Sequence, residues 1–244
     1  MTGYPSVISA DTPIILPNWA VNPNVKSFFT TRKGDPKAAS TVGEYIRDAS
    51  QSRDKTHIEP VWLEQIHSTV VLRLNTRIKG LRGDGIITKI KEFPCAIRVA
   101  DCVPILLCDE GGTEVSAIHA GWRGLLSGIV QKAVESFSCK ESGIIAWVGP
   151  SISKFAYNVG ADFFELFTAK DTDYRQYFEK KENLLYFDIR EAVKSTLHGS
   201  GITKLFETAR CVHTESDSFY SARRQKTNER MAAVIWISCS GRQA

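Results

Sequence analysis

The stretch that decides the fold spans residues 96–119 and reads AIRVADCVPILLCDEGGTEVSAIH. An apolar run fills residues 96–108, the turn sequence DEGG follows at residues 109–112, and residues 115–119 are apolar again. Two apolar runs joined by a short Gly-containing turn are typical of a β-hairpin. The sequence therefore predicts an antiparallel pair of strands here.

The register of this hairpin follows from the position of its turn. If the turn is centred between Glu110 and Gly111, Cys102 lies opposite His119, and Pro104 lies opposite Ala117. Directly opposed side chains share a face, with Cβ atoms roughly 4.5–5.5 Å apart. Proline lacks the N–H of a ladder and favours edges or bulges, and a bulge at Pro104 would shift the register by one residue. The regular register makes Cys102 and His119 neighbours.

The rest of the chain predicts one domain over residues 1–244, with an irregular lead-in at residues 1–24. Its fold class is α/β of the α+β type, with mixed sheets and flanking helices, because strands and helices do not alternate regularly. No internal repeat and no low-complexity linker divides it. The expected strands cover 25–31, 61–67, 69–74, 86–88, 144–148 and 232–237, and the expected helices cover 125–137, 163–167 and 189–197.

Composition excludes several classes of protein. The 244 residues are 43% hydrophobic and 24% charged with a net charge of +4, as in an ordinary globular protein. No block of like charges predicts a nucleic-acid partner, and no apolar run approaches the roughly 18 residues of a membrane span. The N-terminus lacks the pattern of a signal peptide, and the six cysteines form no C-x-x-C pair. We expect a cytoplasmic monomer or homodimer that binds a small molecule and no membrane.

Three residues predict a metal site. His67, Cys102 and His119 offer two imidazoles and one thiolate, a natural ligand set for Zn²⁺ that leaves a fourth position open for water or substrate. A single cysteine in an apolar strand is more often structural, and the cross-strand coincidence alone leaves both interpretations about equally favoured. Arg123, in the turn after His119, could contact an anion, and a plain strand-to-helix turn explains it as well.

Six motifs together resemble one known family, the YfiH family, also called the laccase-like multicopper polyphenol oxidase family. The resemblance covers roughly residues 25 to 238. The pair Ala-Asp-Cys and His-Ala-Gly-Trp-Arg-Gly, in this order, is highly specific. The motifs are Gln65-Ile66-His67, Gly83-Asp84-Gly85, Ala100-Asp101-Cys102-Val103-Pro104, His119-Ala120-Gly121-Trp122-Arg123-Gly124, Gly149-Pro150-Ser151-Ile152 and Phe219-Tyr220-Ser221-Ala222-Arg223-Arg224.

The resemblance implies a single-domain α/β fold and a zinc ion held by His67, Cys102 and His119. Members of the family are described as purine nucleoside phosphorylases that also deaminate adenosine and phosphorolyse methylthioadenosine. Others are described as peptidoglycan editing factors that remove a misincorporated serine from a cell-wall precursor, or as polyphenol oxidases.

Two segments depart from the family pattern. The chain has Arg32-Lys33-Gly34-Asp35 where the family usually has Arg-x-Gly-Gly. It has Thr227-Asn228-Glu229-Arg230 where the family usually has Thr-Gly-Arg. Neither change touches the three expected metal ligands.

The resemblance implies a zinc-dependent purine nucleoside phosphorylase with adenosine deaminase side activity, acting on a purine nucleoside and phosphate. Asp84 and Asp101 are the candidate proton carriers. The candidate contacts for substrate or phosphate are Arg32, Gln65, Arg123 and Arg223.

Three alternatives remain open. A peptidoglycan editing amidase would use the same metal site. Cu²⁺ could replace Zn²⁺ and give modest oxidation, although five scattered histidines cannot build a multicopper centre. A metal-free cysteine hydrolase would use Cys102 as nucleophile and His119 as base.

Overall fold

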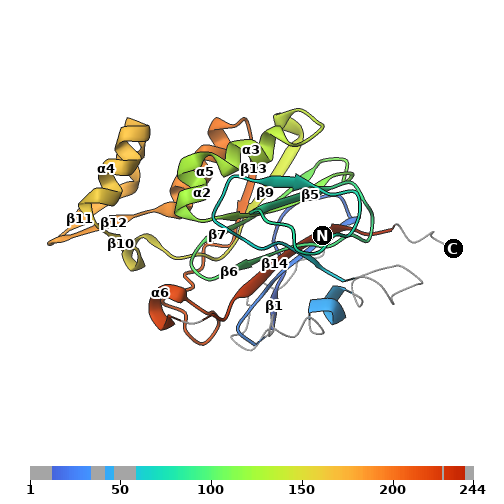
Figure 1. Ribbon diagram of the computed structural model, residues 1–244, viewed down its shortest axis with the longest axis horizontal. Helices are drawn as coiled ribbons and strands as arrows, with labels where there is room; N and C mark the ends of the chain where they lie inside the picture. The colour runs from blue at the N-terminus through green and yellow to red at the C-terminus, as the bar shows by residue number, and fades with distance from the viewer. Residues whose placement is uncertain (1–12, 34–41, 47–58, 227, 240–244) are drawn as a thin grey trace.

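A six-stranded and a five-stranded sheet pack against each other in the computed structural model of the chain (Figure 1). The structure describes residues 13–33, 42–46, 59–226 and 228–239. Helices cover the other face of the six-stranded sheet, so the mixed α/β fold with flanking helices is as predicted.

The six-stranded sheet forms the centre of the domain. Its order is β13 (Lys204–Glu207), β9 (Ile144–Val148), β7 (Val103–Asp109), β8 (Val115–Ala120), β5 (Gly85–Thr88) and β4 (Val71–Arg73). Every residue of β7, β8 and β9 is buried, because the sheet is covered on both faces. Ile105 and Leu107 pack toward the helices, and Leu106 and Cys108 pack toward the second sheet.

The five-stranded sheet contributes the other half of the inter-sheet core. Its order is β1 (Ile14–Ile15), β2 (Val25–Thr30), β14 (Met231–Ile237), β6 (Cys95–Val99) and β3 (Val61–Trp62). The predicted strands at 25–31 and 232–237 are confirmed as β2 and β14. A short helix at residues 42–46 packs on the outer face. The lead-in predicted to be irregular contains β1, and residues 1–12 of it lie outside the described part of the chain.

The apolar run at residues 96–108 is two strands, and its prediction as one strand is wrong. The chain leaves β6 in one sheet and enters β7 in the other, through Ala100, Asp101 and Cys102. Asp101 has a φ of 84°, a backbone conformation that ends a strand. The carboxylate of Asp101 accepts hydrogen bonds from Ser221 and Arg223, which fix this turn between the sheets.

The predicted hairpin is confirmed, but its predicted register is wrong by two residues. Pro104, and not Cys102, lies opposite His119. The His119 N–H bonds to the Asp84 carbonyl on β5's side, and the Pro104 carbonyl accepts from Gly149 on the other side. Neither residue directs its backbone groups at the other, so proline removes no hydrogen bond from the β7–β8 pair and needs no bulge there. On the other side it lies just beyond the last pair of β7 with β9, Ile105 and Val148.

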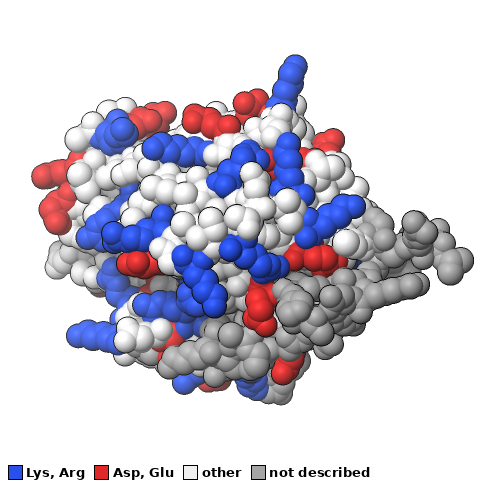
Figure 2. Space-filling model, turned by 45° about the vertical axis from the view of Figure 1, so that its right-hand side comes forward, with Lys and Arg blue, Asp and Glu red and all other residues white. Residues whose placement is uncertain are grey.

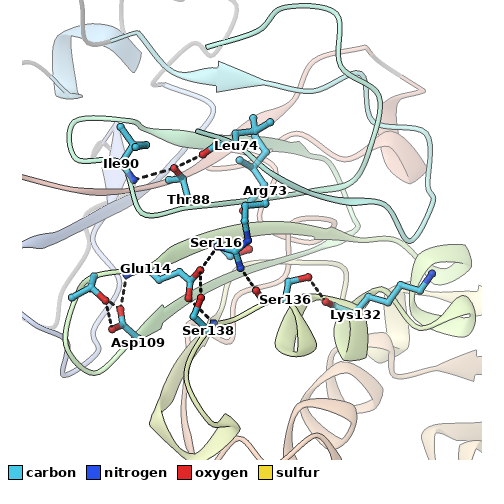
Figure 3. Close-up of polar contacts among 12 residues, drawn as sticks. Arg73, Leu74, Thr88, Ile90, Asp109, Glu114, Ser116, Lys132, Ser136 and Ser138 are labelled. Carbon is cyan, nitrogen blue, oxygen red and sulfur yellow. Dashed lines mark hydrogen bonds and ion pairs between the residues drawn. The ribbon is translucent and has the colours of Figure 1, made fainter. Parts of the chain in front are cut away.

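The turn explains the shift, because it is longer than the predicted one and is centred between Gly111 and Gly112. Asp109 accepts hydrogen bonds of 2.7 Å from the Thr113 N–H, the Thr113 hydroxyl and the Glu114 N–H (Figure 3). Gly112 adopts a φ of 65°, which glycine tolerates. The buried Glu114 carboxylate pairs with Arg73 and accepts from the Ser138 N–H. The side chain of Asp109 thus sets the length of the turn.

The helix predicted at 125–137 is two helices, α2 (Trp122–Ser127) and α3 (Ile129–Glu135). Gly128, with a φ of 95°, ends the first. The predicted apolar face is buried against the sheet. The helices predicted at 163–167 and 189–197 lie within α4 (Ala161–Lys170) and α5 (Ile189–Gly199). Figure 1 shows α2, α3 and α5 together along one side of the six-stranded sheet.

The remaining elements were not expected from the sequence. A three-stranded sheet of β10 (Asn158–Val159), β12 (Leu184–Phe187) and β11 (Phe178–Lys181) extends from the body beside α4 (Figure 1). Stacked and edge-on aromatic rings fill the space between α4 and this sheet, among them Phe163, Phe167 and Phe187. The short helices are η1 (Glu141–Gly143), η2 (Lys154–Ala156), η3 (Thr172–Tyr177) and α6 (Ala222–Gln225).

Charge is mixed over the surface that Figure 2 shows, with Lys and Arg side chains lying among Asp and Glu and uncharged surface. The helices of the described ranges are all too short or too polar to cross a bilayer.

The Asp109 turn gives a test of what sets the register. Asp109→Ala removes three accepted hydrogen bonds at a buried position. Asp109→Asn keeps an oxygen for the two backbone N–H groups and turns its amide toward the Thr113 hydroxyl. We expect Asp109→Ala to lower the free energy of unfolding by about 2 kcal/mol and the Tm by about 4–8 °C, and Asp109→Asn to cost less than half of this. Urea and thermal denaturation measure both, and equal stability of the two variants would contradict the role of the carboxylate.

Candidate metal centre

The structure brings His67, Cys102 and His119 together where the two large sheets meet. His67 lies in the loop after β3, Cys102 in the link from β6 to β7, and His119 near the end of β8. Their ligand atoms all lie within 4.8 Å of one another, and Cys102 Sγ is 4.0 Å from His67 Nε2. Small side-chain rotations bring the three to bonding distances of about 2.0–2.3 Å from one ion. These residues can hold a metal.

Gly121 provides the space that the ligand set occupies. A Cβ atom at Gly121 would lie 2.8 Å from His67 Cδ2 and 3.2 Å from Cys102 Sγ. The φ of Gly121 is −75°, so the backbone itself would accept any residue. Close packing of ligands around this position therefore requires the absence of a side chain.

A buried carboxylate, that of Asp84, holds two of the three ligands. Asp84 Oδ1 lies 2.8 Å from His119 Nδ1 and accepts from the His67 N–H at 3.0 Å. Asp84 Oδ2 accepts from the Ser68 N–H and hydroxyl at 2.6 and 2.8 Å. His67 has a φ of 58°, and these bonds hold it in that left-handed conformation. A carboxylate on Nδ1 leaves Nε2 of His119 for a metal, as in many zinc sites.

Electrostatics favour a charged centre in the metal-free protein. Burial alone would raise the pKa of Asp84, but hydrogen bonds from His119 and Ser68 outweigh it and lower the pKa to about 2. Burial alone would also raise the pKa of the Cys102 thiol, but the positive charge and hydrogen bond of His119 lower it to about 6. Burial opposes a charge on His119, and the Cys102 thiolate and Asp84 raise its pKa to about 9. Thiolate and imidazolium stabilise each other.

The two predicted proton carriers have their oxygens occupied. Asp84 is bonded as described. Asp101 accepts from the Ser221 hydroxyl at 2.6 Å with one oxygen and from the Arg223 N–H at 2.7 Å with the other. This geometry favours positioning roles for both: Asp84 orients the histidines, and Asp101 attaches α6 to the neighbourhood of Cys102.

The four predicted substrate contacts separate into two groups. Gln65 and Arg223 line the pocket beside the triad, whereas Arg32 and Arg123 are not among its lining residues. Arg32 bonds to the Ser216 carbonyl and lies over the Tyr220 ring, and Arg123 stacks on Trp122. The Gln65 amide donates to the Arg98 carbonyl at 2.8 Å and accepts from the Arg98 N–H at 2.7 Å.

The pocket has a volume of about 760 Å³, within the usual range of small-molecule sites. Sequence reasoning did not single out several of its polar residues as part of a site, among them Glu64, Arg98, Tyr157, Lys226 and Arg230. The sequence does mark Arg98 as unusual, because it is the one charged residue in the apolar stretch 96–100. No feature of the sequence marks Tyr157, which directly precedes β10, a strand that was not predicted.

Known proteins resemble the chain over most of its length. A family model described as "Multi-copper polyphenol oxidoreductase laccase" matches residues 28–238. The protein named purine nucleoside phosphorylase YfiH of Escherichia coli K12 is 34% identical over 92% of this chain and 98% of its own length. The purine nucleoside phosphorylase of Haemophilus influenzae is 34% identical over 91% of this chain and 98% of its own length. The crystal structure of Neisseria meningitidis protein NMB0706 superposes with a TM-score of 0.83 at 29% identity, covering 93% of this chain and all of that one.

Filling the space beside Gly121 with a side chain tests whether a metal binds to the three ligands. We expect protein purified without chelator to hold about one divalent ion per chain, and Cys102→Ala to hold none. Gly121→Ala should weaken metal binding at least about tenfold, because its Cβ displaces the His67 ring. Gly199→Ala is the matched control, since nothing lies within 4 Å of its Cβ. Elemental analysis and competition with a chromogenic chelator measure the effect, and wild-type affinity in Gly121→Ala would count against a metal at this position.

The lowered pKa of Cys102 predicts selective alkylation of the metal-free protein. Above pH 6 the thiolate dominates, so reaction with iodoacetamide should rise about tenfold from pH 5 to pH 7 and then level off. The exposed Cys139 is the internal control, because partial burial and Asp109 raise its pKa. Peptide mass spectrometry follows both, and a Cys102 midpoint near pH 8.5 would show that His119 does not stabilise the thiolate.

Proposed function

Because the chain belongs to the YfiH family, whose model is described as multi-copper polyphenol oxidoreductase laccase, we propose that it is a zinc-dependent purine nucleoside phosphorylase. Its substrates would be inosine, adenosine and methylthioadenosine, with adenosine deamination as a side activity. The observation that carries the proposal is the His67, Cys102 and His119 group at a pocket of nucleoside size. The names of its full-length relatives support the same activity.

The donor set supports zinc at one site. Two imidazoles and a thiolate with an open position match catalytic zinc better than a set of copper sites. Within the described ranges, this is the one group of three or more His, Cys, Asp and Glu side chains arranged to hold an ion. A copper ion at the same ligands would give a modest oxidase and remains the alternative metal. The six cysteines are free, which fits a reducing cytoplasm.

The reaction makes separate demands on the residues of the pocket. Phosphorolysis of inosine breaks the bond between C1′ and the purine nitrogen, joins a phosphate oxygen to C1′ and leaves the purine with a proton. When bound, zinc supplies a Lewis acid that polarises a substrate oxygen. Apolar side chains such as Leu63 and Ile152 line the pocket and exclude water. Burial raises the pKa of Tyr157, so its hydroxyl stays protonated and can donate a hydrogen bond to substrate.

A second function has an observation in its favour. The Cys102 thiolate beside protonated His119 is also the pair of a cysteine hydrolase, with Cys102 as nucleophile. Such an enzyme needs no metal, so it would keep full activity in EDTA with less than about half an equivalent of zinc bound.

Turnover of inosine tests the proposal. Inosine with phosphate should yield hypoxanthine and ribose 1-phosphate, detected by chromatography and a coupled xanthine oxidase assay. Cys102→Ala and His119→Ala should lower kcat at least about 1,000-fold, because each removes a ligand. Cys139→Ala, an exposed cysteine outside the pocket lining, is the control and should retain wild-type rates. Release of serine from a UDP-linked muramyl-serine precursor, with no turnover of any nucleoside, would overturn the proposal in favour of peptidoglycan editing.

A further inference from the structure

The pocket beside the triad carries an excess of positive charge. Four cationic residues and two carboxylates line it; the cations are Arg98, Arg223, Lys226 and Arg230. Neither carboxylate pairs with the side chain of Arg223 or Lys226, because Asp101 accepts from the Ser221 hydroxyl and the Arg223 backbone N–H, and Glu64 pairs with Arg82. An anion is therefore the ligand that this wall of the pocket favours.

Arg223 is held so that most of its guanidinium faces no protein acceptor. Its Nη1 donates to the Asn158 carbonyl at 3.1 Å and lies 3.4 Å from the Asn158 amide oxygen. The guanidinium lies over the Tyr157 ring, 5.1 Å from its centroid. Nε and Nη2 make no hydrogen bond to any residue in the described part of the chain. These two groups form the fork that binds a phosphate through two parallel bonds.

The segment that carries Arg223 and Lys226 is fixed relative to the metal ligands. Asp101, next to Cys102 in sequence, accepts from the Ser221 hydroxyl and the Arg223 N–H. On the other side of α6, Arg224 donates to the carbonyls of Val212, His213 and Phe219. The two adjacent arginines therefore do different things: Arg224 anchors the helix, and Arg223 faces the pocket.

Lys226 adds a second cation from the end of the same helix. It caps α6 with a φ of 49° and lines the pocket. Within the described ranges, neither Arg223 nor Lys226 forms an ion pair. Two cations without counter-ions, on one short segment tied to the neighbour of Cys102, suit a dianion better than an uncharged group.

We propose that Arg223 and Lys226 form the phosphate subsite of this pocket, which rests on the proposed phosphorolysis. Phosphate bound there lies on the α6 side of the triad. The nucleoside then occupies the space lined by Leu63, Ile152 and Tyr157, with C1′ directed toward the phosphate.

Kinetics of two charge-removing variants test this subsite. Arg223→Gln and Lys226→Gln should each raise the KM for phosphate at least about tenfold and change the KM for inosine less than about twofold. Arg223→Lys should recover only part of the loss, because it keeps the charge and lacks the fork. Lys79→Gln, an exposed lysine outside the pocket lining, controls for the loss of one charge. Unchanged Tm and metal content show that the variants fold.

Direct titration of the intact protein with inorganic phosphate separates this inference from the proposed function. Wild-type protein should bind phosphate in a calorimeter, and Arg223→Gln should bind at least about tenfold more weakly. Binding that Arg223→Gln weakens, without nucleoside turnover, would support the subsite and reject the phosphorylase. Inosine turnover with wild-type KM for phosphate in both Gln variants would reject the subsite and leave the phosphorylase. A rise in that KM in Arg98→Gln alone would place phosphate at β6 and overturn the assignment.

Discussion

The Asp84 carboxylate is fully buried, and the arrangement of the candidate centre depends on it. It binds His119 through Nδ1, holds the backbone of His67 and Ser68, and accepts the Ser68 hydroxyl. A carboxylate with this many donors stays ionised, because its hydrogen bonds compensate for the lost hydration. Its negative charge in turn stabilises the positive charge of His119, which stabilises the Cys102 thiolate. One buried anion thus orders two histidines and supports the ionisation of a cysteine.

The position of Asp84 follows from the sheet. It directly precedes β5, whose first residue, Gly85, pairs with Ile118 on β8. The Asp84 carbonyl accepts from the His119 N–H, so main chain and side chain both reach the same histidine. Asp84 holds the loop after β3 to the six-stranded sheet, and the Gln65 amide holds it to the backbone of Arg98 in the five-stranded sheet. Strand β8 therefore places His119, and hydrogen bonds to Asp84 fix the loop that carries His67.

Much of the fold was predictable because its central strands are strongly apolar and its turns contain glycine. The register was not, since the side chain of Asp109 lengthens the turn by hydrogen bonds that a residue count cannot show. The break at Asp101 was also hidden, because β6 and β7 are both mostly apolar and a link of only three residues, with Asp101 in a left-handed conformation, separates the sheets. Cys102 and His119 meet nonetheless, around Gly121 and not across a ladder. The triad could be named from its residue types and motifs, whereas the pocket cations on α6 depend on a tertiary contact to Asp101.

The split of the apolar run between two sheets has a thermodynamic consequence. His67 follows a strand of the five-stranded sheet, His119 belongs to the six-stranded sheet, and Cys102 lies in the crossing between them. An ion that binds all three can do so only when the two layers are packed, so binding and folding are linked by mass action. At a free metal concentration of 1,000 times the Kd, this linkage adds about 4 kcal/mol to the stability of the folded state. The packing of the two sheets would then be most stable in cells that supply the metal, and the lifetime of the protein would depend on the availability of that metal.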